Sequence, residues 1–253
     1  MCDEAKDGHV TSAFSCAEIV AALYYSIMNI KPEDPTWKNR DRFIMSKNHG
    51  SVITYPILED LGYFSAKHQK PFLMNDGYLG GHTKLTIPGA DFAGGSLGIG
   101  LGVGAGLAYA AKQDLAQWNT YCIIGDGECY EGSIWESVMF AAANNLNNLV
   151  VFLDRNRLTL SDFTENMLPL ESMEDKWKAF GWNVKTINGH NIKEIIDAVS
   201  EVPRRESNKP LCVICNTSKG KGIDYLEDKM YRHGFAPTGD QAKEAIRQIM
   251  EGN

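Results

Sequence analysis

Apolar runs and polar breaks alternate along most of the chain. Apolar runs of strand length are found at 42–46, 121–124, 149–153 and 211–215, and a further strand is predicted at 182–187. Most are separated by longer segments in which apolar residues recur three and four positions apart, as on one buried face of a helix. Strands that alternate with helices in this way are typical of an α/β fold. The pattern therefore predicts a doubly wound, mostly parallel sheet with helices on both faces.

The helical segments differ in the signals that mark them. Ser15 and Glu18 have the spacing of a capping box, so a helix is predicted to begin at Ser15. The glycine- and alanine-rich run 97–111 is predicted as a helix that packs closely against another. Asn191 is the expected cap of a helix over 192–202. Further helices are expected at the N-terminus, at the C-terminus and over 50–61, 132–145 and 173–180.

Three segments lack a regular pattern, namely 63–95, 161–170 and 218–240. Long loops in compact domains are usually functional or disordered. The chain has 253 residues, enough for one large α/β domain with a full core, and we expect 1–253 to form a single domain.

Composition excludes several classes of function. The net charge is −7, without a basic run, so a nucleic-acid partner is not expected. The N-terminus is polar and no apolar stretch reaches about 18 residues, so we expect neither a signal peptide nor a membrane span, and a cytoplasmic protein. The spacing Cys212-x-x-Cys215 could suggest metal or redox chemistry. In a strand, however, these two thiols face opposite sides of the sheet, so buried thiols are the preferred interpretation.

Candidate chemistry lies at the ends of two neighbouring strands. The run 121–124 ends at Gly125-Asp126-Gly127, and Asn156 follows the next strand, thirty residues after Asp126. A helical crossover makes these strands parallel neighbours, so both side chains are predicted at the carboxyl edge of the sheet. The glycines and the following helix would accommodate a diphosphate, and the oxygen ligands suit Mg²⁺ or Ca²⁺. The Gly-Asp-Gly turn alone is equally compatible with Asp126 as an ordinary helix cap.

Histidines are the second candidate group. Five of the six lie beside a glycine: His9, His49, His82, His190 and His233. A single pair of this kind more often has a structural role. We expect four of them to gather over the carboxyl edge, where an imidazole can donate to phosphate or relay protons. His190 is the expected exception, because the neighbouring Asn191 resembles a helix cap.

Six motifs in one order resemble the N-terminal, diphosphate-binding half of transketolases, especially the form encoded as a separate subunit. They are DGH at 7–9, DRFIMSKNHG at 41–50, GGH at 80–82, GGSLGIGLGVGAGLAYA at 94–110, GDGECYEG at 125–132 and DRNRLTLSD at 154–162. Each motif alone is a weak signal, and their joint order makes the resemblance specific. It implies a thiamine-diphosphate-binding fold of the PP type.

The resemblance implies a metal and a cofactor. Asp126, Asn156 and the carbonyl of Leu158 are the implied ligands of Mg²⁺, for which Ca²⁺ or Mn²⁺ could substitute. The cofactor is thiamine diphosphate, and besides Asp126 and Asn156 its implied contacts are His49, Gly94, Ser96, Leu97, Gly125, Gly127, Glu131 and His233.

These contacts have different implied roles. His49, His233 and the backbone of Gly127 hold the diphosphate. Leu97 packs near the cofactor, and Glu131 matches a glutamate at a subunit interface that helps to couple the two sites.

His9, His82 and His233 are the implied catalytic residues, with His9 and His82 facing the thiazolium and the substrate. The family's proline-glycine after the first Gly-His is Val10-Thr11 here, at the mouth of the substrate channel.

The activity implied is that of a transferase of aldehyde or ketone residues. A two-carbon ketol unit passes from a ketose or ketose phosphate to an aldose or aldose phosphate. The family's cofactor-activating glutamate lies in a pyrimidine-binding domain, so we expect a separate C-terminal subunit, in an α₂β₂ heterotetramer. The chain also begins later than the family pattern.

Two alternatives remain open at this stage. One is a related thiamine-diphosphate transferase that acts on a modified, for example sulfonated, sugar. The other is a non-catalytic paralogue, which would not need the substrate-facing histidines. The sequence does not name the sugar.

Overall fold

The computed structural model describes residues 1–68, 71–75, 77–202 and 207–252. In these residues one sheet of five parallel strands has the order β1-β2-β3-β5-β4. The strands are β1 (Arg42–Met45), β2 (Thr120–Gly125), β3 (Leu149–Arg155), β4 (Asn183–Asn188) and β5 (Leu211–Asn216). Each of them falls within one or two residues of a predicted strand, and the predicted α/β fold with a parallel sheet is confirmed.

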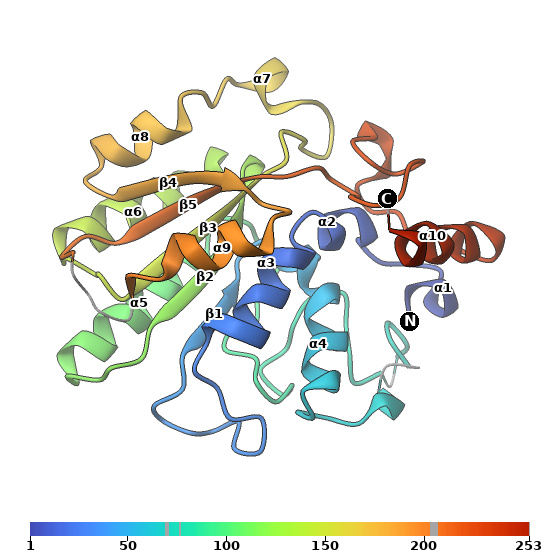
Figure 1. Ribbon diagram of the computed structural model, residues 1–253, viewed down its shortest axis with the longest axis horizontal. Helices are drawn as coiled ribbons and strands as arrows, with labels where there is room; N and C mark the ends of the chain where they lie inside the picture. Colours follow the sequence, from blue (N-terminus) through green and yellow to red (C-terminus); the bar gives the residue numbers. More distant parts are fainter. Residues whose placement is uncertain (69–70, 76, 203–206, 253) are drawn as a thin grey trace.

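Helices connect the strands and cover the sheet (Figure 1). The α-helices are α1 (Cys2–Ala5), α2 (Val10–Phe14), α3 (Ala17–Ala22), α4 (Thr54–Asp60), α5 (Gly100–Gln113), α6 (Gly132–Ala143), α7 (Thr164–Met167), α8 (Met173–Ala179), α9 (Ile192–Val199) and α10 (Asp240–Glu251). A π-helical turn, Leu23–Ile27, extends α3. Short 3₁₀ helices span Asn48–Ile53, Ala66–His68, Gly127–Tyr130 and Met230–Arg232.

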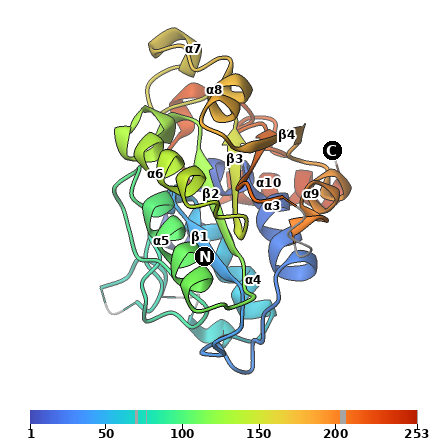
Figure 2. The ribbon, with the colours of Figure 1, turned by 90° about the vertical axis from the view of Figure 1, so that its left-hand side faces the viewer.

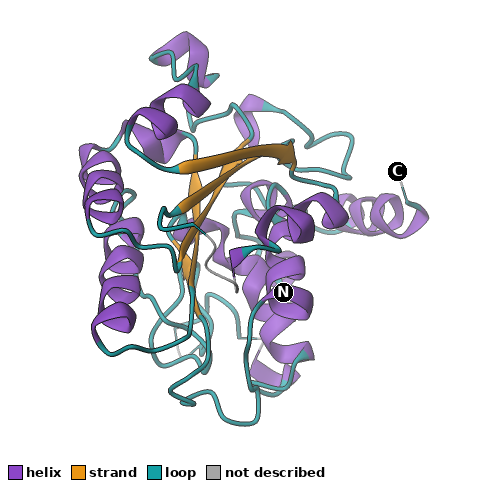
Figure 3. Ribbon diagram, turned by 60° about the vertical axis from the view of Figure 1, so that its left-hand side comes forward, coloured by secondary structure: helices purple, strands orange, loops and turns teal. Residues whose placement is uncertain are grey.

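The sheet lies between two helical layers, which Figure 3 shows on either side of the strands. Alternate residues of each strand supply two separate apolar clusters, because successive side chains point to opposite faces. On one face, Ile124 and Leu153 pack with α5, α6 and α8. On the other, Ile123 and Phe152 pack with α3, α4 and α9. α5 and α6 lie side by side on the outer surface (Figure 2).

Several predicted details hold. Asn191 caps α9 and accepts a hydrogen bond from the amide of Glu194. Cys212 and Cys215 are free, buried thiols in the two opposite clusters, as their spacing in a strand requires. Among the described residues no helix has both the length and the apolar character needed to cross a bilayer.

Other predicted details are wrong. The helix predicted to begin at Ser15 begins at Ala17 as α3, and a separate short helix, α2, precedes it. Ser15 does not cap α3, because its hydroxyl donates to the carboxylate of Asp154 at 2.7 Å. α5 starts at Gly100 and not at Leu97, because Gly98 has a φ of +85° that no right-handed helix accommodates. The segment 161–170, predicted as a loop, contains α7.

Candidate cofactor site

The ends of β2 and β3 bring together the polar residues predicted to lie side by side. Gly125 pairs with Asp154 across these strands, and the amide of Asp126 donates to the carbonyl of Asp154 at 3.2 Å. Asp126 and Asn156 therefore follow directly on neighbouring strand ends at the carboxyl edge. Parallel pairing produces this proximity, as the crossover through α6 requires.

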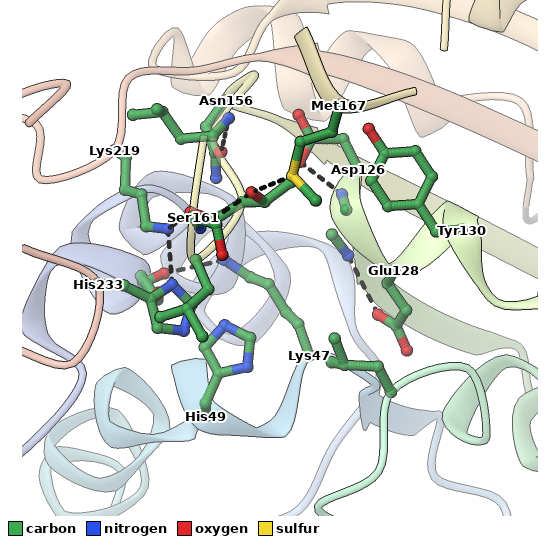
Figure 4. Close-up of a pocket in the computed structure, with 17 residues that line it drawn as sticks. Lys47, His49, Asp126, Glu128, Tyr130, Asn156, Ser161, Met167, Lys219 and His233 are labelled. Carbon is green, nitrogen blue, oxygen red and sulfur yellow. Dashed lines mark hydrogen bonds between the residues drawn. The ribbon is translucent and has the colours of Figure 1, made fainter. Parts of the chain in front are cut away.

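A cavity of about 290 Å³ opens at this edge (Figure 4). Many of the residues proposed from the sequence line it: His49, Leu97, Gly125, Asp126, Gly127, Asn156, Leu158 and His233. Its other walls include Ser12, Lys47 and Lys219, together with residues of the segment 158–167. The carboxyl edge of an open parallel sheet is where such folds bind ligands.

The carboxylate of Asp126 is almost completely buried. Oδ1 accepts from the amide of Gly127 at 2.7 Å, so Asp126 caps the 3₁₀ turn Gly127–Tyr130. Oδ2 accepts from the amide of Arg157 at 2.6 Å and from Nη1 of Arg155 at 2.9 Å. Burial raises the pKa of Asp126, although the Arg155 charge opposes that shift. The helix-cap role and a metal-binding role use the same side chain and do not exclude each other.

The buried guanidinium of Arg155 was not among the predicted site residues. Besides Asp126, it donates to the hydroxyl of Thr164 at 2.7 Å and to the carboxylates of Glu165 and Glu171 at 2.7 and 2.8 Å. These contacts fasten the segment that carries α7 to the end of β3. Arginine suits this role because its rigid fork can serve several acceptors at once.

Asn156 directly follows Arg155 at the carboxyl end of β3. Its Oδ1 accepts from the amide of Leu158 at 3.0 Å, and its Nδ2 donates to Ser15 at 3.0 Å. Among the described residues no group of three or more His, Cys, Asp or Glu side chains has the arrangement of a metal site. A cation at this edge would therefore combine Asp126 with amide and carbonyl oxygens, and oxygens of a bound ligand would complete its shell.

Three of the four expected histidines do meet. The ring centroids of His9, His49 and His233 lie 5.0–5.4 Å from one another. Burial, and then the charge of Lys47, lowers the pKa of His49 to about 2, and burial with the Lys219 charge lowers the pKa of His233 to about 4. These imidazoles are consequently neutral near pH 7, in a region rich in positive charge.

Lys219 supplies part of that charge and was not among the predicted site residues. Its Nζ lies 2.8 Å from Nδ1 of His233 and 3.3 Å from the carbonyl of Thr159. Burial and the charge of Lys47 lower the pKa of Lys219 to about 8. The available signal was its position: it follows the carboxyl end of β5 and precedes Gly220, as Asp126 follows β2 and precedes Gly127.

Lys47, in contrast, already has a counter-ion. Its Nζ lies 2.5 Å from Asp154, and both side chains are buried. Burial would lower the pKa of Lys47, but the Asp154 carboxylate raises it above its ordinary value. Asp154 also accepts from Ser15 and Thr217, so it anchors the first helices, β3 and the segment after β5 to one point.

Glu128 is a second buried carboxylate that the sequence did not single out. It accepts hydrogen bonds from the hydroxyl of Ser46 and from the amides of Gly98, at 2.8 Å, and Gly125, at 3.2 Å. Burial raises the pKa of Glu128. By these contacts it ties the glycine-rich turn before α5 to the ends of β1 and β2.

The remaining predicted residues do not line the cavity. In the part of the chain that the structure describes, the lining does not include His9, His82, Gly94, Ser96 or Glu131. Ser96 and Glu131 are exposed. A Cβ on Gly98 would lie 2.6 Å from Cβ of Glu131, which places Glu131 against the start of α5.

His82 and His190 lie outside the three-ring cluster. His82 is exposed, and its charge contributes to the lowered pKa of His9. His190 has the structural role predicted for it. Its Nε2 accepts from the amide of Ser218 at 2.8 Å, and its Nδ1 lies 3.0 Å from Glu18.

The fold and the cavity define an α/β protein with a basic pocket at the carboxyl edge of a parallel sheet, next to a buried aspartate. The family follows from comparison. Residues 1–252 match the family described as "Transketolase, thiamine diphosphate binding domain", so the chain belongs to the transketolase family.

Similar proteins have transketolase names. The chain is 41% identical to an apulose-4-phosphate transketolase subunit of Phocaeicola vulgatus, over 98% of this chain and 88% of that protein. It is 39% identical to 6-deoxy-6-sulfo-D-fructose transketolase subunit SqwG of a Clostridium species, over 96% of this chain and 88% of that protein. Human transketolase is 36% identical over 97% of this chain, which spans 39% of that protein. The chain is accordingly of the transketolase type, a class of transferases.

A solved structure gives the same result. Transketolase from Campylobacter jejuni superimposes with a TM-score of 0.92 at 30% identity. The match covers 98% of this chain and 40% of that one. The five-stranded sheet described above is therefore the sheet of a transketolase domain.

Proposed function

We propose that this chain is the thiamine-diphosphate- and Mg²⁺-binding subunit of a transketolase that transfers a two-carbon ketol unit between sugars. The observation that carries the proposal is the meeting of His49, His233 and Lys219 at one cavity beside Asp126, with the ring of His9 packed against those of His49 and His233. Two similar proteins, each named as a transketolase subunit, support it. In this proposal 1–253 is a single PP-type domain.

The cavity fits an anionic diphosphate. Lys219 is a buried cation of its wall that has no salt bridge among the described residues, whereas Lys47 is paired with Asp154. The hydroxyl of Ser12 is buried at the same wall and has no hydrogen-bond partner among the described residues. A buried polar group without a partner is costly, and a bound phosphate oxygen would satisfy it. His49, His233, Lys219 and Ser12 are therefore the proposed diphosphate ligands.

The metal fits on the other side of the same cavity. Asp126 provides one carboxylate oxygen, Asn156 an amide oxygen and Leu158 a carbonyl, and all three residues line the wall. Such a hard oxygen set suits Mg²⁺, with Ca²⁺ or Mn²⁺ as substitutes. Gly125 and Gly127 would border the cofactor directly, Leu97 would pack against it, and Gly94, Ser96 and Glu131 would contribute from the rim.

When bound, thiamine diphosphate supplies a carbon nucleophile for cleavage of the ketose carbon–carbon bond. The residues of this chain would hold the cofactor and move protons. Because the pKa values of His9 and His233 are lowered, both imidazoles are neutral at pH 7. Each imidazole can therefore accept a hydroxyl proton from the sugar and return it. His82, which is exposed, is the proposed third catalytic histidine at the substrate side.

A second subunit is part of the proposal. The two similar proteins are named as subunits, and this chain spans 40% of the Campylobacter jejuni transketolase. Exposed apolar side chains on α5 and α6, including Val103, Tyr109 and Phe140, offer a surface for association. We propose that the partner is a C-terminal, pyrimidine-binding subunit, in an α₂β₂ heterotetramer that functions in the cytoplasm.

The sugar is a further question, on which the names of the relatives bear. One relative is named for apulose 4-phosphate and another for 6-deoxy-6-sulfo-D-fructose. These names favour a modified sugar as an alternative to the substrates of an ordinary transketolase. A non-catalytic paralogue is disfavoured by the histidine cluster, since cofactor binding alone does not require His9 and His82.

The decisive experiment is reconstitution. The purified chain, free of a copurifying partner by mass spectrometry, should show no ketol transfer with thiamine diphosphate and Mg²⁺. When a C-terminal transketolase subunit is titrated in, activity should appear and saturate at a one-to-one ratio. Transfer by the isolated chain at the rate of an intact transketolase would refute the two-subunit proposal. If the chain binds thiamine diphosphate neither alone nor together with the C-terminal subunit, the cofactor assignment is refuted.

A further inference from the structure

The first turn of α2 joins the two chain segments that carry the basic groups of the cavity. Thr11 lies in this turn and is 1% exposed. Its hydroxyl donates to the carbonyl of Arg232 at 2.8 Å and lies 3.2 Å from the carbonyl of His233. Its own carbonyl accepts from the amide of Gly220, directly after Lys219, at 2.9 Å.

Thr11 therefore contacts His233 itself and the residue directly after Lys219. Lys219 and His233 are 14 positions apart, in the segment between β5 and α10, where the described regular structure is the single 3₁₀ turn Met230–Arg232. Long irregular segments have weak internal support, so contacts to the rest of the fold determine where their side chains lie. The Thr11 hydroxyl provides such a contact, to the backbone carbonyls of Arg232 and His233.

The same turn also positions His9, the third member of the basic cluster. His9 is the residue before α2, and its ring centroid lies 5.3 Å from that of His233. A shift of the segment at 232–233 would change both this distance and the 2.8 Å contact with Lys219. Thr11 itself lies behind the cavity wall, which Ser12 forms in this turn.

We propose that Thr11 is a positioning residue of the diphosphate site, whose hydroxyl holds His233 in place against Lys219 and His9. It would contact neither cofactor nor substrate. The inference rests on the proposed function, since it concerns the same site. It goes further in assigning the geometry of the basic cluster to one hydroxyl group, on a residue that does not itself reach the ligand.

Two substitutions separate the hydroxyl from the side-chain volume. Thr11→Val keeps the size and branching and removes the donor, whereas Thr11→Ser keeps the donor. The probe is inorganic diphosphate with Mg²⁺, titrated by calorimetry into the full chain. We expect Thr11→Val to weaken binding about three- to tenfold, as the loss of one hydrogen bond does, and Thr11→Ser to stay within about twofold of the unchanged chain.

A double-mutant cycle tests the route of the effect. If Thr11 acts through His233, then adding Thr11→Val to His233→Ala should cause no further loss of diphosphate affinity. Amide hydrogen exchange at 232–234 should be faster in Thr11→Val and unchanged in Thr11→Ser. Should Thr11→Val not fold, as judged by circular dichroism, Thr11→Ala takes its place in the cycle.

The outcomes distinguish the two proposals. Undetectable diphosphate binding by the unchanged chain would show that the proposed function is wrong. Normal binding by the unchanged chain and equal binding by Thr11→Val would overturn the role of Thr11 alone. An equal loss from Thr11→Val with and without His233 would also overturn it, because the hydroxyl would then act elsewhere.

Discussion

Asp126 and Arg155 form a buried ion pair, with 2.9 Å between Oδ2 and Nη1. This pair means that the proposed metal ligand also has a structural role, which its place at a strand end does not reveal. A small neutral substitution such as Asp126→Ala would remove one of the carboxylates that pair with the buried guanidinium of Arg155. The two roles therefore need different substitutions.

The metal role is tested by Asp126→Asn, which preserves the size and removes the negative charge. We expect this substitution to abolish Mg²⁺-dependent binding of thiamine diphosphate, because a neutral amide is a far weaker ligand for a hard divalent cation. Calorimetry with and without Mg²⁺, in the presence of the partner subunit, is the measurement. Unchanged affinity would remove Asp126 from the metal shell.

The structural role is tested by Arg155→Met. Breaking a buried ion pair on one side leaves an uncompensated charge, here on Asp126, so we expect a loss of about 3 kcal/mol in the free energy of unfolding. Denaturant unfolding measures it. Arg157→Met is the matched control, because Arg157 is exposed and its side chain contacts Asn216 at 3.2 Å. A similar loss in both variants would contradict a special role for the buried guanidinium.

The histidines should separate by role. His49→Ala and His233→Ala are expected to weaken cofactor binding first, because both rings line the cavity beside the proposed diphosphate site. His82→Ala should lower kcat about 100-fold, since a general acid–base group usually contributes a factor of about this size. It should change cofactor affinity little. Steady-state kinetics of the reconstituted enzyme and cofactor titrations provide the two readouts. The reverse pattern would show that the two groups are exchanged.

Diphosphate binding should take up protons. In the free chain the pKa of Lys219 is lowered to about 8, so near pH 8 this side chain is neutral in about half of the molecules. A bound anion favours the charged form and raises this pKa again, so binding at pH 8 should take up about half a proton and binding at pH 6 should take up none at this lysine.

Calorimetry in buffers of different ionisation enthalpy measures this uptake. Lys219→Met should remove the uptake at pH 8. Lys221→Met is the control, since Lys221 pairs with Glu227 at 2.9 Å and does not line the cavity as described. Proton release, or uptake that persists in Lys219→Met, would contradict the assignment of Lys219 to the anion.

Much of the fold could be predicted from the sequence, because its signals are local. A strand buried on both faces needs a short continuous apolar run, and β1, β2, β3 and β5 match such runs, whereas β4 is only partly buried. The crossover rule then places Asp126 beside Asn156 without further information. Helix starts were less accurate: Ser15 and Glu18 match a capping box, but the hydroxyl of Ser15 instead bonds to Asp154, 139 positions away.

The sequence alone determined the α/β class, the edge of the sheet where the site lies and the candidate acid, amide and histidines, because strand pairing and crossover direction follow from local patterns. Only the tertiary structure decided which cations are already paired. Lys47 meets Asp154, and Lys219 meets His233. The physical reason is that burial and nearby charges determine the pKa of a side chain and whether its hydrogen-bond donors have partners. Both depend on contacts between residues far apart in the chain.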